Sequence, residues 1–362
     1  MNAPFAPLPS QADGPILLDG AMGEGGGQVL RSGLALACLT GRSLELSRIR
    51  AGRRKPGLMR QHLTCVRAAA RASGAAVEGG ELNSTELRFV PAGLFPIHGR
   101  FEIGTAGSTA LVIQTVLLPL LFADGPSEIE LAGGTDVLAA PSIAFLQGTF
   151  LPLLHSMGAS AQLELIRSGY YPAGGGLVKL RITPLGSAGR LSPVELDAAP
   201  VDHGISAHAT TARIPASVAL RELEKLAERL SIPDQQLHGH RDVDSVGPGN
   251  VVHVHVRMDD GRLVILEAYG RRGRSAEQVA GGLAKNVERF VNAKVAVSEH
   301  LADQVLLPLA LAGGGSFTTT EPSLHTRTNA EVICAVLGTE FDVEELGSDR
   351  FRVRIQPRPT TP

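Results

Sequence analysis

A single imidazole lies in a segment whose other side chains include short hydroxyls and an amide, Pro-Ser-Leu-His-Thr-Arg-Thr-Asn at residues 322–329. No Cys, Asp or Glu lies within three positions of His325, so the segment is poorly suited to bind a metal ion locally. The neighbouring hydroxyls and the amide of Asn329 can fix the tautomer of the imidazole and hydrogen-bond a phosphate. The pattern suggests a nucleophilic histidine, although a histidine that is simply packed or solvated also fits the segment when it is taken alone.

A second candidate is the glycine-rich segment Gly-Glu-Gly-Gly-Gly-Gln at residues 23–28, which directly precedes an apolar helical pattern. Bare backbone N–H groups at the start of a helix can approach a phosphate, and the carboxylate of Glu24 can hold a divalent metal ion. A tight turn is the alternative interpretation. The segment is not a Walker loop, because no Lys-Ser or Lys-Thr follows, and it fails G-x-G-x-x-G because residue 28 is glutamine.

Residues 48–62 carry six positive charges and neither an acid nor an aromatic residue, in a chain whose formal net charge is −2. Pro56 and Gly57 interrupt this run, so we expect a loop that presents Arg50 and Arg53 rather than a plain helix face. Guanidinium groups on such a loop can clamp phosphates bidentately. The absence of aromatics argues against a stacking platform for long single strands. A phosphorylated RNA end is therefore favoured over sequence readout or a merely decorative basic surface.

The elements that would position these residues alternate between helical and strand-like patterns, with glycines between them. The patterns predict four helix-then-strand pairs, at residues 29–39 and 44–49, 58–73 and 75–78, 109–122 and 129–131, and 143–157 and 161–165. Gln114 and Gln304 each begin a short run that ends in Leu-Leu-Pro-Leu. This weak internal similarity favours repeated α/β units packed around a common axis.

Composition changes near residue 187, after which a charged amphipathic helix is predicted at 217–230 and a second helix, with a capping pattern, at 275–292. Asp-Asp-Gly at 259–261 predicts a hairpin between strands at 251–256 and 263–268. We therefore expect an α+β domain at 187–296, inserted between the first part of a catalytic core at 1–186 and its last part at 297–362. His253 and His255 share one strand face, which we interpret as a polar face because no third metal ligand at suitable spacing is evident.

The chain has 362 residues, of which 43% are hydrophobic and 42 are glycine, which is enough for two compact domains. Its net charge excludes a surface that coats nucleic acid uniformly, so a polyanion would have to meet a local basic patch. Three scattered cysteines favour a reducing, cytoplasmic location. The first 15 residues do not resemble a signal peptide, and the sequence contains no apolar run long enough to predict a membrane span. A homo-oligomer is compatible with this composition.

Five motifs, taken in order, resemble the RNA 3'-terminal phosphate cyclase family over almost the whole chain. They are Gly-Glu-Gly-Gly-Gly-Gln-x-x-Arg at 23–31, Arg-Ala-Gly-Arg-x-Lys-Pro-Gly-Leu at 50–58, Tyr-Pro-Ala-Gly-Gly-Gly-Leu at 171–177, Leu-Ala-Asp-Gln at 301–304, and the His325 segment. The resemblance implies a core of repeated enolpyruvyl-transferase-like α/β units with a small inserted domain. It also implies ATP-dependent conversion of an RNA 3'-terminal phosphate to a 2',3'-cyclic phosphate, with help from a divalent metal ion.

By this resemblance, His325 attacks the α-phosphate of ATP to form a covalent histidine-AMP, and AMP then passes to RNA as an RNA-(3')pp(5')A intermediate. Glu24 is implied to serve the metal ion and the triphosphate. The residues implied to line the nucleotide pocket are Gln114, Pro141, His300, Leu301, Ala302, Asp303 and Gln304, and those implied to bind substrate phosphates are Arg31, Arg50, Arg53, Gln61 and His62. Position 300, commonly an aromatic in bacterial members, is here a histidine, which offers a ring face to adenine but is also a rival nucleophile.

Without the resemblance, we would interpret Gln114 as a polar residue in a core helix. Asp303 would be interpreted as a carboxylate near a helix N-terminus. Two other functions are compatible with the same architecture. A non-catalytic ribosome-biogenesis relative would keep the RNA-facing surface but lack the nucleophile, which His325 argues against. An enolpyruvyl transferase would act on phosphoenolpyruvate and a small acceptor, and the basic run suits either substrate. Covalent labelling by ATP separates these alternatives from a cyclase.

Overall fold

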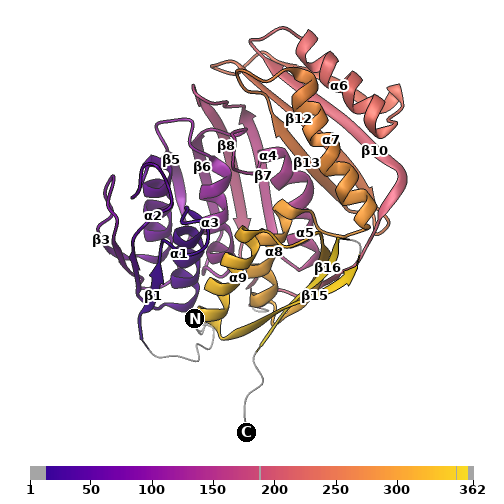
Figure 1. Ribbon diagram of the computed structural model, residues 1–362. Coiled ribbons are helices and arrows are strands. Elements are labelled where there is room, and N and C mark those ends of the chain that lie inside the picture. The colour runs from indigo at the N-terminus through magenta and orange to yellow at the C-terminus, as the bar shows by residue number, and fades with distance from the viewer. Residues whose placement is uncertain (1–13, 187–188, 348, 358–362) are drawn as a thin grey trace.

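The computed structural model describes residues 14–186, 189–347 and 349–357 (Figure 1). The predicted domain boundary at residue 187 and most of the first 15 residues lie outside these ranges. The fold is mixed α/β, as predicted, and the described strands form four sheets of four strands each. Across the same ranges, no helix is both long and apolar enough to cross a membrane.

Three of these sheets share one connectivity. In each sheet the first two strands along the chain are parallel, and the connection between them includes a helix. The fourth strand pairs antiparallel with the second, and the third pairs antiparallel with the fourth. The order across the sheet is therefore first, second, fourth, third. The N-terminal unit contains β1 (Ile16–Asp19), α1 (Gln28–Thr40), β2 (Leu44–Ser47), α2 (Arg60–Ser73), β3 (Ala76–Glu78) and β4 (Leu87–Val90). The middle unit contains β5 (His98–Glu102), α3 (Thr109–Leu121), β6 (Ser127–Gly133), α4 (Ile143–Phe145), η1 (Leu146–Phe150), α5 (Leu151–Ser156), β7 (Ser160–Arg167) and β8 (Gly176–Thr183). The C-terminal unit contains β9 (Glu195–Leu196), α8 (Glu299–Leu311), β14 (Gly315–Thr319), α9 (Leu324–Leu337), β15 (Thr339–Gly347) and β16 (Arg350–Pro357).

The helices of the three units pack against one another, and α1 contacts α2, α3 and α9. From Val29 to Thr40 nearly every residue of α1 is buried, as expected for a helix enclosed on all sides. The helix ends at Gly41, whose φ of 70° lies in the left-handed region that glycine adopts most easily. One hydrophobic core includes residues of all three units. This packing brings segments from both ends of the chain together.

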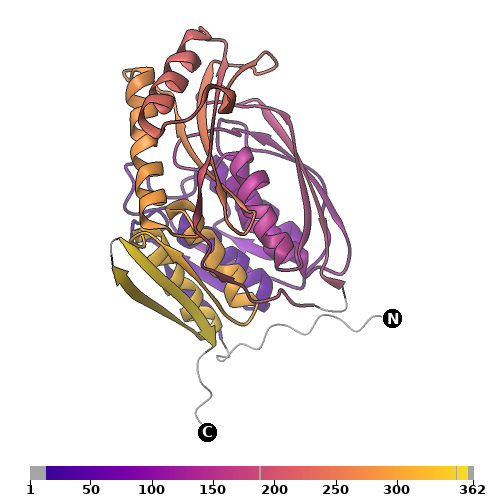
Figure 2. The ribbon, with the colours of Figure 1, turned by 90° about the vertical axis from the view of Figure 1, so that its right-hand side faces the viewer.

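The fourth sheet belongs to a segment that is inserted between β9 and α8. Its elements are β10 (Pro200–Ala212), α6 (Ser217–Leu230), η3 (Asp234–Gln236), β11 (Leu237–Asp242), β12 (Gly249–Met258), β13 (Leu263–Tyr269) and α7 (Ala276–Ala293). Helices α6 and α7 cover one face of the sheet and share a hydrophobic core with it (Figures 1 and 2). The predicted helices, the hairpin and the capping box of Ser275 with Gln278 are confirmed. The limits of this segment as a domain stay a prediction.

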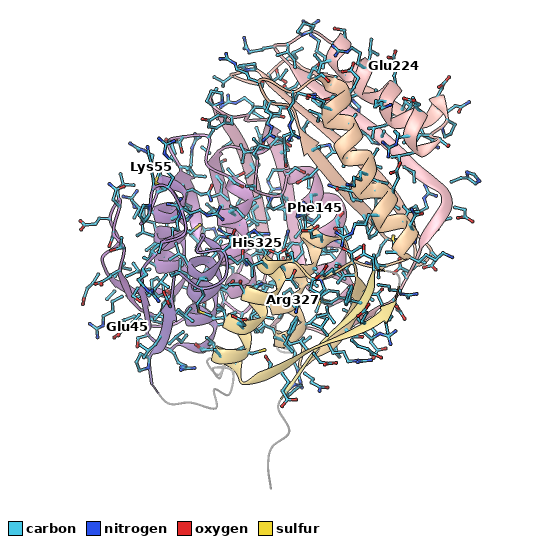
Figure 3. All side chains as sticks on the ribbon, in the orientation of Figure 1. Glu45, Lys55, Phe145, Glu224, His325 and Arg327 are labelled. Carbon is cyan, nitrogen blue, oxygen red and sulfur yellow. The ribbon has the colours of Figure 1, made fainter. Side chains whose placement is uncertain are left out.

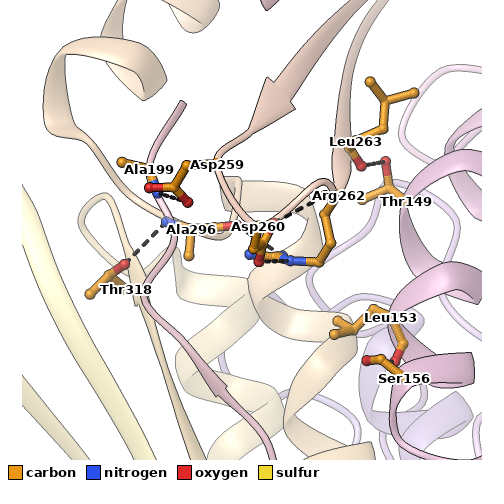
Figure 4. Close-up of polar contacts among 10 residues, drawn as sticks. All are labelled: Thr149, Leu153, Ser156, Ala199, Asp259, Asp260, Arg262, Leu263, Ala296 and Thr318. Atoms are coloured by element: carbon orange, nitrogen blue, oxygen red, sulfur yellow. Dashed lines mark hydrogen bonds and ion pairs between the residues drawn. The ribbon is translucent and has the colours of Figure 1, made fainter. Parts of the chain in front are cut away.

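The opposite face of this sheet meets the middle unit through β13. The Thr149 hydroxyl on η1 donates to the Leu263 carbonyl at 3.1 Å (Figure 4). The same hydroxyl accepts from the Ile265 N–H at 2.9 Å. The turn between β12 and β13 also holds both ends of the segment. Ala199 N–H donates to the Asp259 carboxylate at 3.1 Å, and Arg262 Nη1 donates to the Ala296 carbonyl at 3.4 Å (Figure 4). The two ends of the segment are therefore tied to one turn.

The helix predicted at 143–157 is the one predicted helix that the structure divides. It consists of α4, a π-helical turn, η1, and α5. Pro152 has no N–H to donate to Gly148, and just before it the N–H of Leu151 donates to the carbonyl of Leu146, five residues back. The proline therefore explains why a regular α-helical ladder does not continue here.

Glu222 is an isolated acid inside the core of the inserted segment. One carboxylate oxygen accepts from Asn250 Nδ2 at 2.8 Å, and the other has no hydrogen-bond partner among the described residues. Burial raises the pKa of Glu222 to about 7. The folded protein therefore keeps the Glu222 proton up to a pH near 7. The unfolded chain, in which the glutamate pKa is ordinary, releases this proton at a lower pH.

We expect this group to make the protein less stable as pH rises from about 4.5 to about 7.5, because deprotonation in that window is easier in the unfolded state. The expected loss is about 1–3 kcal/mol. Urea denaturation of Glu222→Gln across this range should show a flatter pH dependence than the wild type, whereas Glu224→Gln, on the exposed side of α6 (Figure 3), should follow the wild type. Parallel curves for Glu222→Gln and the wild type would contradict the assignment.

Candidate active site

His325 lies in the first turn of α9, at the centre of the view in Figure 3, where the N-terminal unit meets α9. Ser323 caps the helix, and its hydroxyl accepts from the N–H of Thr326 at 3.2 Å. The cap explains why the chain reverses into a helix just before the histidine. The His325 side chain keeps about half of its surface exposed, at 49%, so the ring is accessible to a substrate.

The contact that the structure shows for this ring is with Glu24, not with the hydroxyls beside it in sequence. Nε2 of His325 lies 3.1 Å from Glu24 Oε2, and the same carboxylate pairs with Arg53. The hydrogen bond with His325 is the main cause that lowers the pKa of Glu24, and the same bond raises the pKa of His325. A carboxylate 301 positions upstream thus orients the imidazole.

The glycine-rich loop before α1 brings Glu24 into contact with two other segments. At Gly23, whose φ is 57°, a Cβ would overlap the Thr328 hydroxyl of α9, so only glycine allows this approach. On the other side, the N–H of Gly52 donates to the Gly25 carbonyl at 3.2 Å. The glycine-rich loop therefore lies between helix α9 and the basic segment at residues 48–62.

The predicted phosphate-binding residues surround this loop. A Cβ on Gly27 would lie 2.7 Å from His62 Nε2 and 2.8 Å from Arg31 Nη1, so both side chains cross the start of α1. Burial, followed by the charges of Arg31, Arg50 and Arg53, lowers the pKa of His62 to about 3, which keeps its ring neutral. The side-chain oxygen of Gln61 already has a partner, because Oε1 accepts from the Ser108 N–H at 2.6 Å. Arg50 is held by the carbonyls of Lys55 and Gly57, each at 2.8 Å.

A small hollow of about 50 Å³ lies among α1, α3, η1, α8 and α9. Arg31, Gln114, Asp303 and Gln304 line it, so four of the predicted site residues meet here although the chain places them up to 273 positions apart (304 − 31). Burial raises the pKa of Asp303 to about 6, while the nearby charges of His325, His300 and Arg31 oppose this shift. The lining combines polar side chains with Leu117, Leu118 and Leu307.

A chain of four hydrogen bonds lies beside the hollow, two within α1 and two between helices. Arg31 Nη2 donates to Gln28 Oε1 at 2.7 Å, Gln28 Nε2 donates to the Ser32 hydroxyl at 3.3 Å, and that hydroxyl donates to Asn329 Oδ1 at 2.6 Å. Nδ2 of Asn329 then donates to the Asp303 carbonyl at 2.6 Å. Asn329 is four residues after His325 on the same helix, so these hydrogen bonds join the helix that carries His325 to α1 and α8.

Replacing Asn329 with alanine should lower the free energy of unfolding by about 1–3 kcal/mol, because the Ser32 hydroxyl and the Asp303 carbonyl lose a buried partner. In a Ser32→Ala background the same replacement should cost less, since one of those groups is then already absent. Urea denaturation of both single variants and the double variant measures this coupling. Asn292→Ala, on the exposed side of α7, is the control and should change little; strictly additive costs for the pair would rule the network out.

The remaining predicted residues do not line this hollow. Leu301 and Ala302 are fully buried in the hydrophobic core at the start of α8. His300 is exposed in the same turn, and its carbonyl accepts from Gln304 Nε2 at 2.8 Å. Pro141 lies in the loop before α4, between Ala140, whose carbonyl accepts from Tyr269 at 3.2 Å, and Ser142, whose N–H donates to Glu267 at 2.9 Å.

Gln28, Ser32 and Phe150 line the hollow but were not among the predicted site residues. For two of them the sequence held a signal. Gln28, Arg31 and Ser32 are spaced by three and four positions, so they share one face of a helix that is otherwise almost wholly apolar. Phe150 belongs to the irregular turn η1, for which the sequence offered no comparable pattern.

Comparison with known proteins identifies the family of this chain. A family model described as RNA 3'-terminal phosphate cyclase matches residues 22–343. The chain belongs to the RNA 3'-terminal phosphate cyclase family. A protein named RNA 3'-terminal phosphate cyclase from Ralstonia nicotianae is 46% identical over 364 aligned positions, covering 98% of this chain and 99% of that protein. One of the same name from Ectopseudomonas mendocina is 42% identical over 341 positions, covering 94% and 98%.

The match to the cyclase family spans all the residues that form the site. Glu24 lies near its beginning and His325 near its end, and the inserted segment lies within it. The two cyclases also align over nearly their whole length, so the inserted segment is not an addition foreign to this family.

Proposed function

We propose that this protein converts the 3'-terminal phosphate of RNA to a 2',3'-cyclic phosphate in an ATP-dependent reaction that passes through a covalent adenylate on His325. The observation that carries the proposal is the accessible imidazole of His325, held by Glu24 beside the basic segment and the polar hollow. Membership of the cyclase family supports an ATP-using RNA ligase class of enzyme.

In the first step, a His325 ring nitrogen attacks the α-phosphorus of ATP. A P–N bond forms, the bond from the α-phosphorus to its bridging oxygen breaks, and pyrophosphate leaves. In the second step, an oxygen of the RNA 3'-phosphate attacks the same phosphorus, the P–N bond breaks, and RNA-(3')pp(5')A forms. The 2'-hydroxyl then attacks the terminal RNA phosphorus, loses its proton and displaces AMP. Splitting the reaction in this way replaces one difficult displacement with three easier ones.

Side chains near His325 fit these demands. Arg31, Arg53 and the neutral ring of His62 provide donors for phosphate oxygens, and Arg50 adds positive charge to the same segment. Gln114, Asp303 and Gln304 suit the nucleotide, and the exposed face of His300 suits its base. Holding two phosphorylated substrates in line is the main contribution expected of such a site.

A divalent metal ion, Mg²⁺ or Mn²⁺, also fits the residues present. Mg²⁺ is usually bound through one or two carboxylates together with substrate phosphates and water, and Glu24 offers such a carboxylate beside the nucleophile. Among the described residues no three Cys, His, Asp or Glu side chains converge on one point, so the substrate would supply the other ligands. When bound, the ion would neutralise charge on the triphosphate.

The test is an RNA whose 3'-terminal phosphate carries the label, incubated with the protein, ATP and Mg²⁺. We expect the label to become resistant to phosphatase only when ATP is present, because a cyclic diester has no terminal monoester. Label that stays sensitive to phosphatase would favour the ribosome-biogenesis alternative. Consumption of phosphoenolpyruvate with a small acceptor would favour the enolpyruvyl transferase. Cys38 and Cys65 are buried thiols outside any disulfide, which supports the prediction of a cytoplasmic location.

A further inference from the structure

Five histidines lie on one face of the inserted sheet, on three adjacent strands. His208 on β10 is paired in register with His238 on β11 and with His253 on β12. Because side chains two residues apart point to the same face of a strand, His240 and His255 share that face. It is the face opposite α6 and α7, which pack on Ala207, Ala209, Val252 and Val254 instead. The spacing of His253 and His255 alone could not reveal the partners that β10 and β11 bring.

Four of these imidazoles are in close contact around His208. The ring of His208 stacks on His238 with centroids 4.5 Å apart and on His255 at 4.2 Å. Its Nδ1 lies 3.5 Å from Nε2 of His240, and the planes of those two rings are parallel within 1°. Two nitrogens bound to one tetrahedral zinc ion are about 3.3 Å apart, given zinc–nitrogen bonds of about 2.0–2.1 Å. The His208–His240 pair is therefore already near ligand spacing.

The cluster is accessible to solvent on one side. His208 and His238 are half-buried and His240 is exposed. Beside the cluster, a hollow of about 260 Å³ is lined by Ser206 and His255, among others, and leaves room for water or a small ligand.

We propose that His208, His238 and His240 form a binding site for a transition-metal ion of the zinc class. The arrangement places two ligands at i and i+2 on β11 and the third directly opposite on β10. In the described residues the three rings do not yet converge on one point, so the exposed His240 and half-buried His238 rings must turn about their side-chain bonds. Such rotations take only nanoseconds in exposed side chains. Three protein ligands leave a fourth position for water.

The ligand set separates this site from the active site. Imidazole nitrogens suit Zn²⁺, Ni²⁺ and Cu²⁺, whereas Mg²⁺ and Mn²⁺ prefer the oxygens that Glu24 and phosphates offer. The histidine cluster belongs to the sheet of the inserted segment, and His325 belongs to α9 of the C-terminal unit. The proposal therefore does not depend on the proposed function.

Calorimetric titration of the metal-free full-length protein with ZnCl₂ at pH 7.5, without ATP and in excess Mg²⁺, tests the site. We expect one equivalent of Zn²⁺ to bind to the wild type, and His238→Ala and His240→Ala each to weaken that binding at least about tenfold. The Co²⁺ form should show the visible absorption of a four-coordinate ion, and the same two variants should lose it. Zinc should also raise the melting temperature of the wild type but not of these variants.

Two control variants locate the bound ion. His98→Ala removes an exposed histidine on β5, and His325→Ala removes the candidate nucleophile; both should bind Zn²⁺ like the wild type. Unchanged affinity in His238→Ala and His240→Ala, or loss of binding only in His325→Ala, would overturn the proposal. Melting temperatures of the metal-free variants show whether each is folded, and replacing the exposed His240 should leave them unchanged.

Discussion

Incubation with α-labelled ATP and Mg²⁺ is expected to leave a labelled adenylate on the wild-type protein and none on His325→Ala. The His325 ring is accessible beside the basic segment, and in the proposed mechanism it is the group that carries the adenylate. Loss of a covalent nucleophile typically reduces turnover by more than about 1,000-fold. Denaturing electrophoresis measures the label directly, and the label should be acid-labile because the expected bond joins phosphorus to nitrogen.

His300→Ala is the matched control, because His300 is also exposed and lies close enough to Asp303 to affect its pKa. We expect this variant to keep the label. Addition of RNA that ends in a 3'-phosphate should remove the label from the wild type, and RNA that ends in a 3'-hydroxyl should not. If His300→Ala lost the label and His325→Ala kept it, the two histidines would have been assigned the wrong way round.

The second large effect is expected for Glu24→Gln, which should slow adenylylation of the protein by about 100- to 1,000-fold. Glutamine keeps the size of the side chain but removes the charge that pairs with Arg53 and contacts His325 at 3.1 Å. It also removes the carboxylate best placed for the metal ion. Single-turnover labelling at a series of Mg²⁺ concentrations measures both roles, because a weakened metal site should need more Mg²⁺ for half-maximal rate.

Glu45→Gln serves as the comparison for this variant. Glu45 is an exposed glutamate on β2, paired with Arg88 at 3.8 Å and belonging to no part of the site. Its replacement should leave both the rate and the Mg²⁺ requirement unchanged. A Glu24→Gln protein that adenylylates itself at the wild-type rate would show that the carboxylate only positions the loop.

Local patterns in the sequence predicted much of the fold. The helix at Ser217–Leu230 was placed with its observed bounds, because its charged and apolar residues alternate at helical spacing. Strand β10 was not predicted. It contains Gly204 and several polar residues, and its pairing with β12 shifts register between Pro200 and Ile205. That pairing comes from tertiary contacts, which sequence periodicity does not carry.

In the candidate site, too, local sequence patterns predicted the segments but not the contacts between them. The glycine loop, the basic segment and His325 were each visible as unusual local composition. The contact between His325 and Glu24 spans 301 positions (325 − 24), and the hydrogen bond between Ser32 and Asn329 spans 297. No spacing rule operates over such separations. The hydroxyls beside His325 were expected to fix its tautomer, but Ser323 caps the helix instead.

The turn that holds both Ala199 and Ala296 affects how the C-terminal unit assembles. Strands β9 and β14 pair in parallel although about a hundred residues separate them, so their pairing must close a long loop. An unstructured loop pays an entropic penalty that grows with the logarithm of its length. Both ends of the inserted segment are fixed at the Asp259–Arg262 turn. If the segment folds first, β9 and α8 are therefore held close together, as a short connection would hold them. We therefore expect the segment to fold before the C-terminal unit closes and brings His325 to Glu24.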